Sequence, residues 1–155
     1  MIPSVDDRLG SVVRALTDVI MPSLPVEAGL AQEQMQLVIG QIQIIRAQMD
    51  AAPAFEREEA EDARALGKAL LEAGEGGSAT TAALVDLKAA TDAKTAPRET
   101  RLAIHNAIDS LVRNVAADGS ATFRTKLGQI IVKMQTGRTV KDREWFMPMG
   151  FDSGI

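Results

Sequence analysis

Residues 34–49 read QMQLVIGQIQIIRAQM, and this stretch decides which fold the chain can adopt. At about 100° per residue, its large apolar side chains spread over an arc of roughly 200° of the helical wheel. A surface helix usually carries a narrower apolar stripe, because only one of its sides meets the rest of the protein. We therefore expect a helix over about residues 26–50 to be the central element of the fold, in contact with several neighbours.

Amide side chains recur every seven residues inside this apolar arc, at Gln34, Gln41 and Gln48. A buried primary amide has two donors and two acceptor lone pairs, and leaving one unpaired costs about 1–3 kcal/mol. One interpretation is that this edge of the helix is half-buried and the amide tips reach water. Another is a seam with a second helix, since seven-residue spacing suits a partner crossing at about 20° and polar groups there can fix register. A third is a ligand pocket lined by the amides.

The rest of the chain also shows helical periodicity, and no run alternates with period two for long enough to indicate a sheet. Prolines and glycines mark the ends of the helical segments. The sequence predicts an all-α, antiparallel multi-helix bundle of about six helices, with a central apolar second helix. We expect one domain, 1–155, with a flexible loop at 74–79 and a non-helical C-terminal arm at 144–155. The other predicted helices cover about 4–20, 54–73, a short segment after Thr81, 97–117, and the stretch from Ser120 to Gly137.

The charges are unevenly distributed along the chain. Residues 1–76 carry −7, residues 77–119 carry 0 and residues 120–155 carry +3, which together give the total of −4. A negative total argues against a general nucleic-acid binder. We expect the basic last helix to lie beside an acidic one, in the same chain or in a partner.

The residue types exclude several classes of active site. There is no cysteine and only one histidine, so disulfides, thiolate nucleophiles and most zinc sites are excluded, and no metal or cofactor is expected. His105 precedes Asp109 by one helical turn and the two could pair, but the chain has no serine in a strand-to-helix elbow for such a pair to activate. They remain weak candidates for a polar site. We interpret the acidic residues between 56 and 62 as a solvated helix face.

The end of the chain, DREWFMPMGFDSGI, holds three of the five aromatic residues, Trp145, Phe146 and Phe151. Burying these side chains would contribute several kcal/mol to stability. Leaving them exposed would create an apolar surface patch that favours association. The arm either folds back across its own bundle or docks into a groove on a second copy or another protein.

Two stretches, LPVEAGLAQEQ at 24–34 and REWFMPMGFD at 143–152, resemble a group of small, uncharacterised all-helical proteins of bacteria. The genes of that group often lie near acyl-CoA dehydrogenase and aminoglycoside-phosphotransferase-like reading frames. The resemblance implies an accessory role beside acyl-CoA metabolism, and it carries over no catalytic residues.

These patterns favour a non-catalytic helical protein that acts by association, as a homo-oligomer or as an accessory subunit of another protein. The alternative is a binder of an apolar small molecule such as an acyl chain, held between the helices with glutamine amides orienting its polar end. An enzyme ranks third, because no activated nucleophile or poised acid–base pair can be assembled. The N-terminus carries Asp6 and Asp7 where a secretory signal would be basic, and no apolar run is long enough to span a bilayer, so we expect a cytoplasmic protein.

Overall fold

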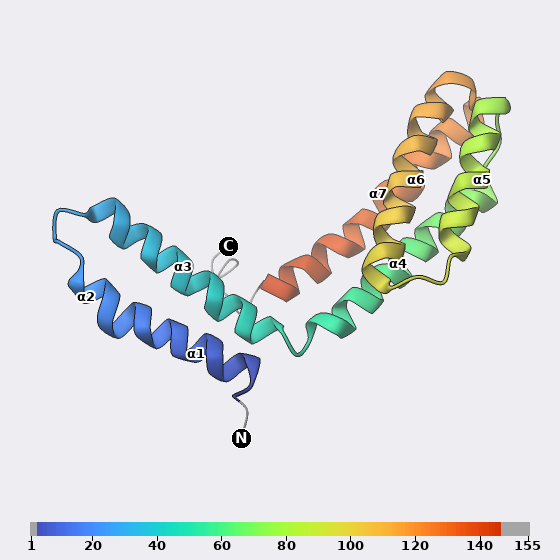
Figure 1. Ribbon diagram of the computed structural model, residues 1–155. Helices are drawn as coiled ribbons and strands as arrows, with labels where there is room; N and C mark the ends of the chain where they lie inside the picture. The colour runs from blue at the N-terminus through green and yellow to red at the C-terminus, as the bar shows by residue number, and fades with distance from the viewer. Residues whose placement is uncertain (1–2, 147–155) are drawn as a thin grey trace. The chain divides into compact units, whose positions relative to one another are not determined.

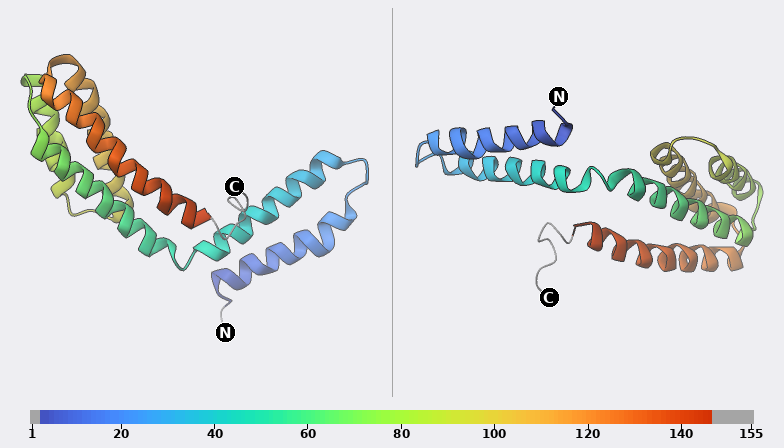
Figure 2. Two further views of the ribbon diagram at one scale, coloured as in Figure 1. Left: turned by 180° about the vertical axis from the view of Figure 1, so that it is seen from behind. Right: turned by 90° about the horizontal axis from the view of Figure 1, so that it is seen from below.

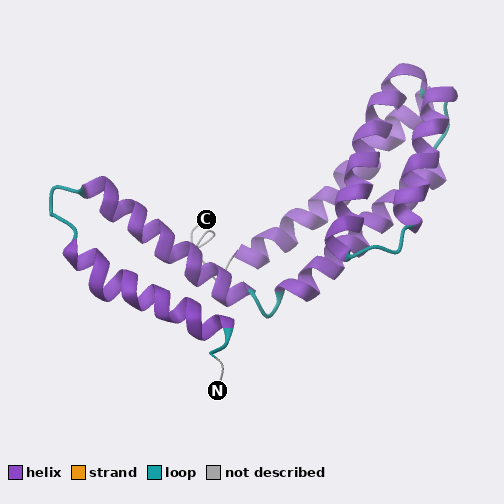
Figure 3. Ribbon diagram, in the orientation of Figure 1, coloured by secondary structure: helices purple, strands orange, loops and turns teal. Residues whose placement is uncertain are grey.

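The computed structural model describes residues 3–146, and every regular element in this part of the chain is a helix (Figure 3). This confirms the predicted all-α fold. Contacts divide the chain into two compact units, residues 1–53 and residues 54–155, where the sequence led us to expect one domain. The elements are α1 (Val5–Ala15), the π-helical turn η1 (Leu16–Ile20), α2 (Met21–Ser23), α3 (Gly29–Gln48), α4 (Ala52–Ala73), α5 (Ser78–Asp92), α6 (Pro97–Asp118) and α7 (Ala121–Phe146).

Unit 1 is a hairpin in which α1, η1 and α2 form one rod and α3 runs back beside it (Figure 1). The first rod begins with a capping box, because the Ser4 hydroxyl accepts a hydrogen bond from the Asp7 N–H and the Asp7 carboxylate accepts one from the Ser4 N–H. Near the open end of the hairpin, the Arg46 guanidinium donates to both Asp6 carboxylate oxygens at 2.7 and 3.0 Å. This bidentate pair sets the register between the two rods.

The prediction that the second helix is central is wrong within unit 1. No residue of α3 is buried, and Gly10, under the Arg46 guanidinium, is the only buried position among the described residues of the unit. The physical reason is that a hairpin gives each helix one neighbour. One neighbour covers one side of an apolar arc that extends over about half of the wheel.

Unit 2 has a continuous apolar core built by α4, α5, α6 and α7 (Figure 2). The helix α6 shows how the sequence builds it, since Ile104, Ile108, Leu111 and Val115 follow the spacing i, i+4, i+7, i+11 and all are buried. Phe123 of α7 is the largest fully buried side chain. The helices α4 and α7 lie side by side in both views of Figure 2.

The loop between α4 and α5, residues 74–77, is held by hydrogen bonds to the turn between α6 and α7. The Gly77 N–H donates to the Asp118 carbonyl oxygen, and the Ser120 N–H donates to the Glu75 carbonyl oxygen. The Asp118 carboxylate also accepts from the Ala79 and Thr80 N–H groups and from the Thr80 hydroxyl, so it caps α5 from 38 residues away. These bonds argue against the flexibility that the sequence predicted for the loop at 74–79.

The last helix is longer than the sequence indicated. We expected Gly137 to end it and a non-helical arm to begin at 144, but α7 continues through Gly137 to Phe146. Glycine inside a helix costs about 1 kcal/mol relative to alanine. Contacts with α4 beyond that point compensate, because Arg138 and Lys141 form ion pairs with Glu59 and Asp62. The rest of the predicted arm lies outside the described residues.

Those same ion pairs confirm that the basic last helix lies beside an acidic helix, here in the same chain. In the part of the chain that the structure describes, no helix combines the length and the apolar character needed to cross a membrane.

The Asp118 cap makes the stability of unit 2 sensitive to acid. Its hydrogen bonds, chiefly the one from the Thr80 hydroxyl, hold the pKa of the Asp118 carboxyl below its ordinary value. This stabilisation is fully present above the ordinary pKa of about 4 and is lost as the pH falls through the lowered pKa. We therefore expect Asp118→Asn to lower the melting temperature at neutral pH and to flatten its fall below about pH 4.

Thermal unfolding followed by circular dichroism at a series of pH values measures both effects. Asp86→Asn, which changes an exposed carboxylate of the same α5 helix, is the matched control. Equal melting temperatures for the two variants would show that Asp118 does not cap α5.

Candidate functional site

The most unusual side chain in unit 2 is that of Glu59 of α4, which is charged but only 5% exposed. Its carboxylate oxygen Oε2 forms an ion pair with the Arg138 guanidinium of α7, at 2.9 Å from Nη2. The same oxygen lies 3.5 Å from Nη1 of Arg101 of α6. Both arginines are about one-third exposed, so their alkyl stems are covered while their charge remains partly hydrated. A buried carboxylate requires such partners, because an unpaired buried charge is strongly destabilising.

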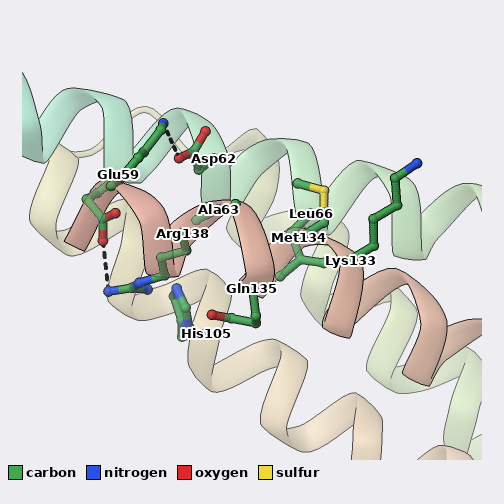
Figure 4. A pocket seen from close by; sticks show the side chains of 11 residues that line it. Glu59, Asp62, Ala63, Leu66, His105, Lys133, Met134, Gln135 and Arg138 are labelled. Atoms are coloured by element: carbon green, nitrogen blue, oxygen red, sulfur yellow. Dashed lines mark hydrogen bonds and ion pairs between the residues drawn. The ribbon is translucent and has the colours of Figure 1, made fainter. Parts of the chain in front are cut away.

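A pocket of about 290 Å³ opens beside this ion pair, between α4, α6 and α7 (Figure 4). Its walls combine the apolar side chains of Leu66 and Met134 with the polar groups of Glu59, His105 and Gln135. Burial, followed by the positive charges of Arg138 and Arg101, lowers the pKa of His105 below its ordinary value. The lowered pKa favours the neutral form of the imidazole at pH 7.

The chemistry available in this pocket is limited. Arg138 and Lys141, which line it, are each engaged by a carboxylate of α4. Among the described residues, no group of three or more His, Asp or Glu side chains is arranged to hold a metal ion. The ion pairs of Glu59 and Asp62 join α4 to α6 and α7, and they act as stabilising contacts between these helices.

The predicted pairing of His105 with Asp109 is not formed. His105 lines the pocket, whereas Asp109 is exposed on the same helix, and no hydrogen bond joins these two described side chains. The arginines influence the imidazole more than Asp109 does. His105 therefore belongs to the α4–α6–α7 cluster instead of forming a pair with Asp109.

The aromatic candidates fall into three environments. The Trp145 ring stacks on the Phe55 ring of the same chain, with centroids 4.2 Å apart and planes inclined by 21°. For Trp145 the contact is intramolecular, while the predicted arm beyond Phe146 lies outside the described residues. Phe146 is 44% exposed at the end of α7, and Phe151 lies outside the described residues.

The glutamine candidates lie on α3 of unit 1, and none of them lines the pocket described above. Gln34 and Gln41 are exposed and Gln48 is half-buried. They form one ladder of a heptad pattern whose second ladder is Ala31, Val38 and Ile45. The first rod has a matching pattern in Val5, Leu9, Val12 and Leu16. We call these ten residues together the apolar hairpin face.

The residues of the apolar hairpin face that belong to the first rod and those that belong to α3 lie on the same side of the hairpin. The half-buried residues Val13 on α1 and Ile39 on α3 indicate where the two helices meet. Val12 directly precedes Val13, and Val38 directly precedes Ile39. Each is therefore rotated by about 100° from the contact, in the same sense when its helix is viewed from the N-terminus. In an antiparallel pair, equal displacements of this kind place both residues on one side. The opposite side carries polar residues: Asp7, Ser11, Arg14, Gln36 and Gln43.

Unit 1 thus keeps a large apolar surface in contact with solvent. In seven of its large apolar side chains, the exposed fraction runs from 46% at Val12 to 73% at Leu30. Burying the remaining exposed half of seven such side chains would contribute about 5–10 kcal/mol. The seven are Val5, Val12, Val19, Leu30, Leu37, Val38 and Ile45.

Sequence reasoning missed Glu59, because the acidic run around it was interpreted as a solvated face. A signal was present, since Glu59 precedes Ala63, Leu66 and Leu70 at the spacing i, i+4, i+7, i+11 and so belongs to the apolar stripe of α4. A carboxylate on an apolar stripe predicts a buried ion pair, and the basic last helix supplied its partner.

No family model matches the chain, and neither a curated protein nor a solved structure is significantly similar to it.

We expect Glu59→Gln to destabilise unit 2 by about 1–3 kcal/mol, because it leaves two partly buried guanidinium groups without their carboxylate. Urea unfolding followed by circular dichroism measures the loss. Glu56→Gln changes an exposed carboxylate one helical turn earlier and is expected to have little effect. Similar midpoints for the two variants would contradict the buried ion pair.

The single histidine allows a direct test of the electrostatics of the pocket. An NMR titration is expected to give His105 a pKa below about 6.5, so that folding stability falls as the pH drops from that ordinary value to the lowered one. Arg138→Gln should raise the pKa of His105, because it removes a positive charge that opposes protonation. Arg113→Gln, at an exposed position of α6, the helix that carries His105, should leave the pKa of His105 unchanged. An ordinary pKa in the unmodified protein would contradict the described geometry.

Proposed function

We propose that this protein acts by association, as a homo-oligomer or as an accessory subunit of another protein, and that the apolar hairpin face is its interaction surface. One observation carries the proposal: among the described residues, unit 1 has no buried apolar side chain, although it exposes a heptad-spaced apolar face. Unit 2, by contrast, buries eleven apolar residues in one cluster.

Stability arguments support this assignment. Isolated helices are marginal in water, and most of their stability in proteins comes from packing an apolar face. A pair of helices that buries only Gly10 gains little from that source. A further layer of helices over the apolar hairpin face would supply the missing core.

The alternative of an apolar ligand held by the glutamine amides has less support. The pocket of about 290 Å³ lies in unit 2 and contains Gln135, not Gln34, Gln41 or Gln48.

The resemblance to helical bacterial proteins encoded near acyl-CoA dehydrogenases agrees with an accessory role beside acyl-CoA metabolism.

The test is a pair of double substitutions on α3. Val38→Asp with Ile45→Asp places two charges on the apolar hairpin face, and we expect association to weaken at least 100-fold, because buried unpaired charges cost several kcal/mol. Gln36→Asp with Gln43→Asp adds the same charges, seven residues apart, on the polar side of the same helix and should not change association. Light scattering after size-exclusion chromatography measures the mass over a range of concentrations.

The proposal would be contradicted by a monomer whose α1 and α3 amides exchange slowly with solvent. Such a result would mean that the hairpin is stable without a partner.

A further inference from the structure

We propose that the occupant of the apolar hairpin face is a second copy of this chain, packed as an antiparallel four-helix bundle about a two-fold axis level with Val12 and Gln41. The proposal rests on the proposed function and specifies its partner and geometry. It follows from the register of the hairpin and from the symmetry of its glutamine ladder.

The Asp6–Arg46 ion pair fixes which residues of the two rods lie at the same height. Because both helices rise by the same amount per residue, six positions further along α1 correspond to six positions back along α3. Val12 is therefore level with Gly40, next to Gln41. The π-helical turn begins only at Leu16, so it does not disturb this register.

The glutamine ladder is symmetric about that height, because Gln34 and Gln48 lie seven residues on either side of Gln41 on α3. On the first rod, Val5 lies seven residues before Val12, whereas Val19, seven residues after it, falls in the π-helical turn. A two-fold axis through this level, perpendicular to the helices, places Val12 against its counterpart and Gln41 against its counterpart. It also brings Gln34 level with Gln48 of the second copy. Such an isologous contact requires a self-complementary surface.

The chemistry of the face is self-complementary too. A primary amide both donates and accepts, so two glutamines related by a two-fold axis can satisfy each other, whereas a lysine or glutamate in that place would repel its own copy. None of the ten positions of the apolar hairpin face is charged. A partner of opposite charge would need a charged face to recognise, and this face has none.

The absence of cysteine in the chain makes a direct cross-linking test possible. Val12→Cys and Gln41→Cys, made separately in the full chain, should each form a disulfide-linked dimer under mild oxidation, because symmetry brings each residue onto itself at disulfide distance. Cross-linking should be about tenfold faster than for Gln36→Cys or Gln43→Cys, which lie on the polar side, because only close cysteine pairs can be bridged without backbone movement.

The relative direction of the two hairpins is tested by mixing two cysteine variants. A mixture of Gln34→Cys and Gln48→Cys chains should give mainly the mixed dimer, because an antiparallel arrangement brings these two positions together. Preferential cross-linking of each variant with itself would indicate parallel hairpins and overturn the proposal. Equal rates at Gln41 and Gln43 would overturn it as well.

Native mass spectrometry with hydrogen exchange separates this proposal from the proposed function. A dimer of twice 16.5 kDa with protected hairpin amides supports both. A monomer with unprotected hairpin amides overturns the second copy, while association with a different protein stands. A monomer with protected amides, in which the face is covered by the same chain, overturns both.

Discussion

The structure depends on the width of the apolar arc of α3. One antiparallel neighbour can cover only part of an arc that spans about half of the helix. Met35, Ile39 and Ile42 are therefore half-buried, while Val38, Ile45, Gln34 and Gln41 are exposed. The exposed apolar residues of α3 follow from this geometric limit. Unit 2 avoids it by using four helices, each of which covers the apolar side of another.

The two units treat polar groups on apolar stripes in opposite ways. Glu59 lies on the stripe of α4 and is buried, and two arginines from other helices reach it. Gln34 and Gln41 lie on the stripe of α3 and are exposed. A carboxylate needs partners of opposite charge and thus fixes which helices must lie beside it, whereas an amide is satisfied equally by water or by another amide. The glutamines are therefore compatible with a face that is open before assembly and closed afterwards.

Much of the fold was readable from the sequence, and the failures have local physical causes. Proline and glycine signals located most helix ends, because they act through the backbone of the residues concerned. Gly137 misled us because ion pairs between α7 and α4 involve residues 79 positions apart, which no local pattern contains. The central position expected for α3 failed for a related reason: periodicity shows how much of a helix is apolar, but not how many neighbours the chain provides. The basic last helix was placed correctly, since opposite net charges on two segments are visible without knowing the fold.

The cap that Asp118 provides to α5 also bears on the order in which unit 2 folds. The first turn of α5 lacks a capping side chain of its own, since Gly77 precedes it, and so it depends on a carboxylate at the far end of α6. Until α6 is complete, the start of α5 has no acceptor for its N–H groups and little reason to persist. The two helices should therefore form and open as a single cooperative unit, with α5 unable to outlast α6 during unfolding.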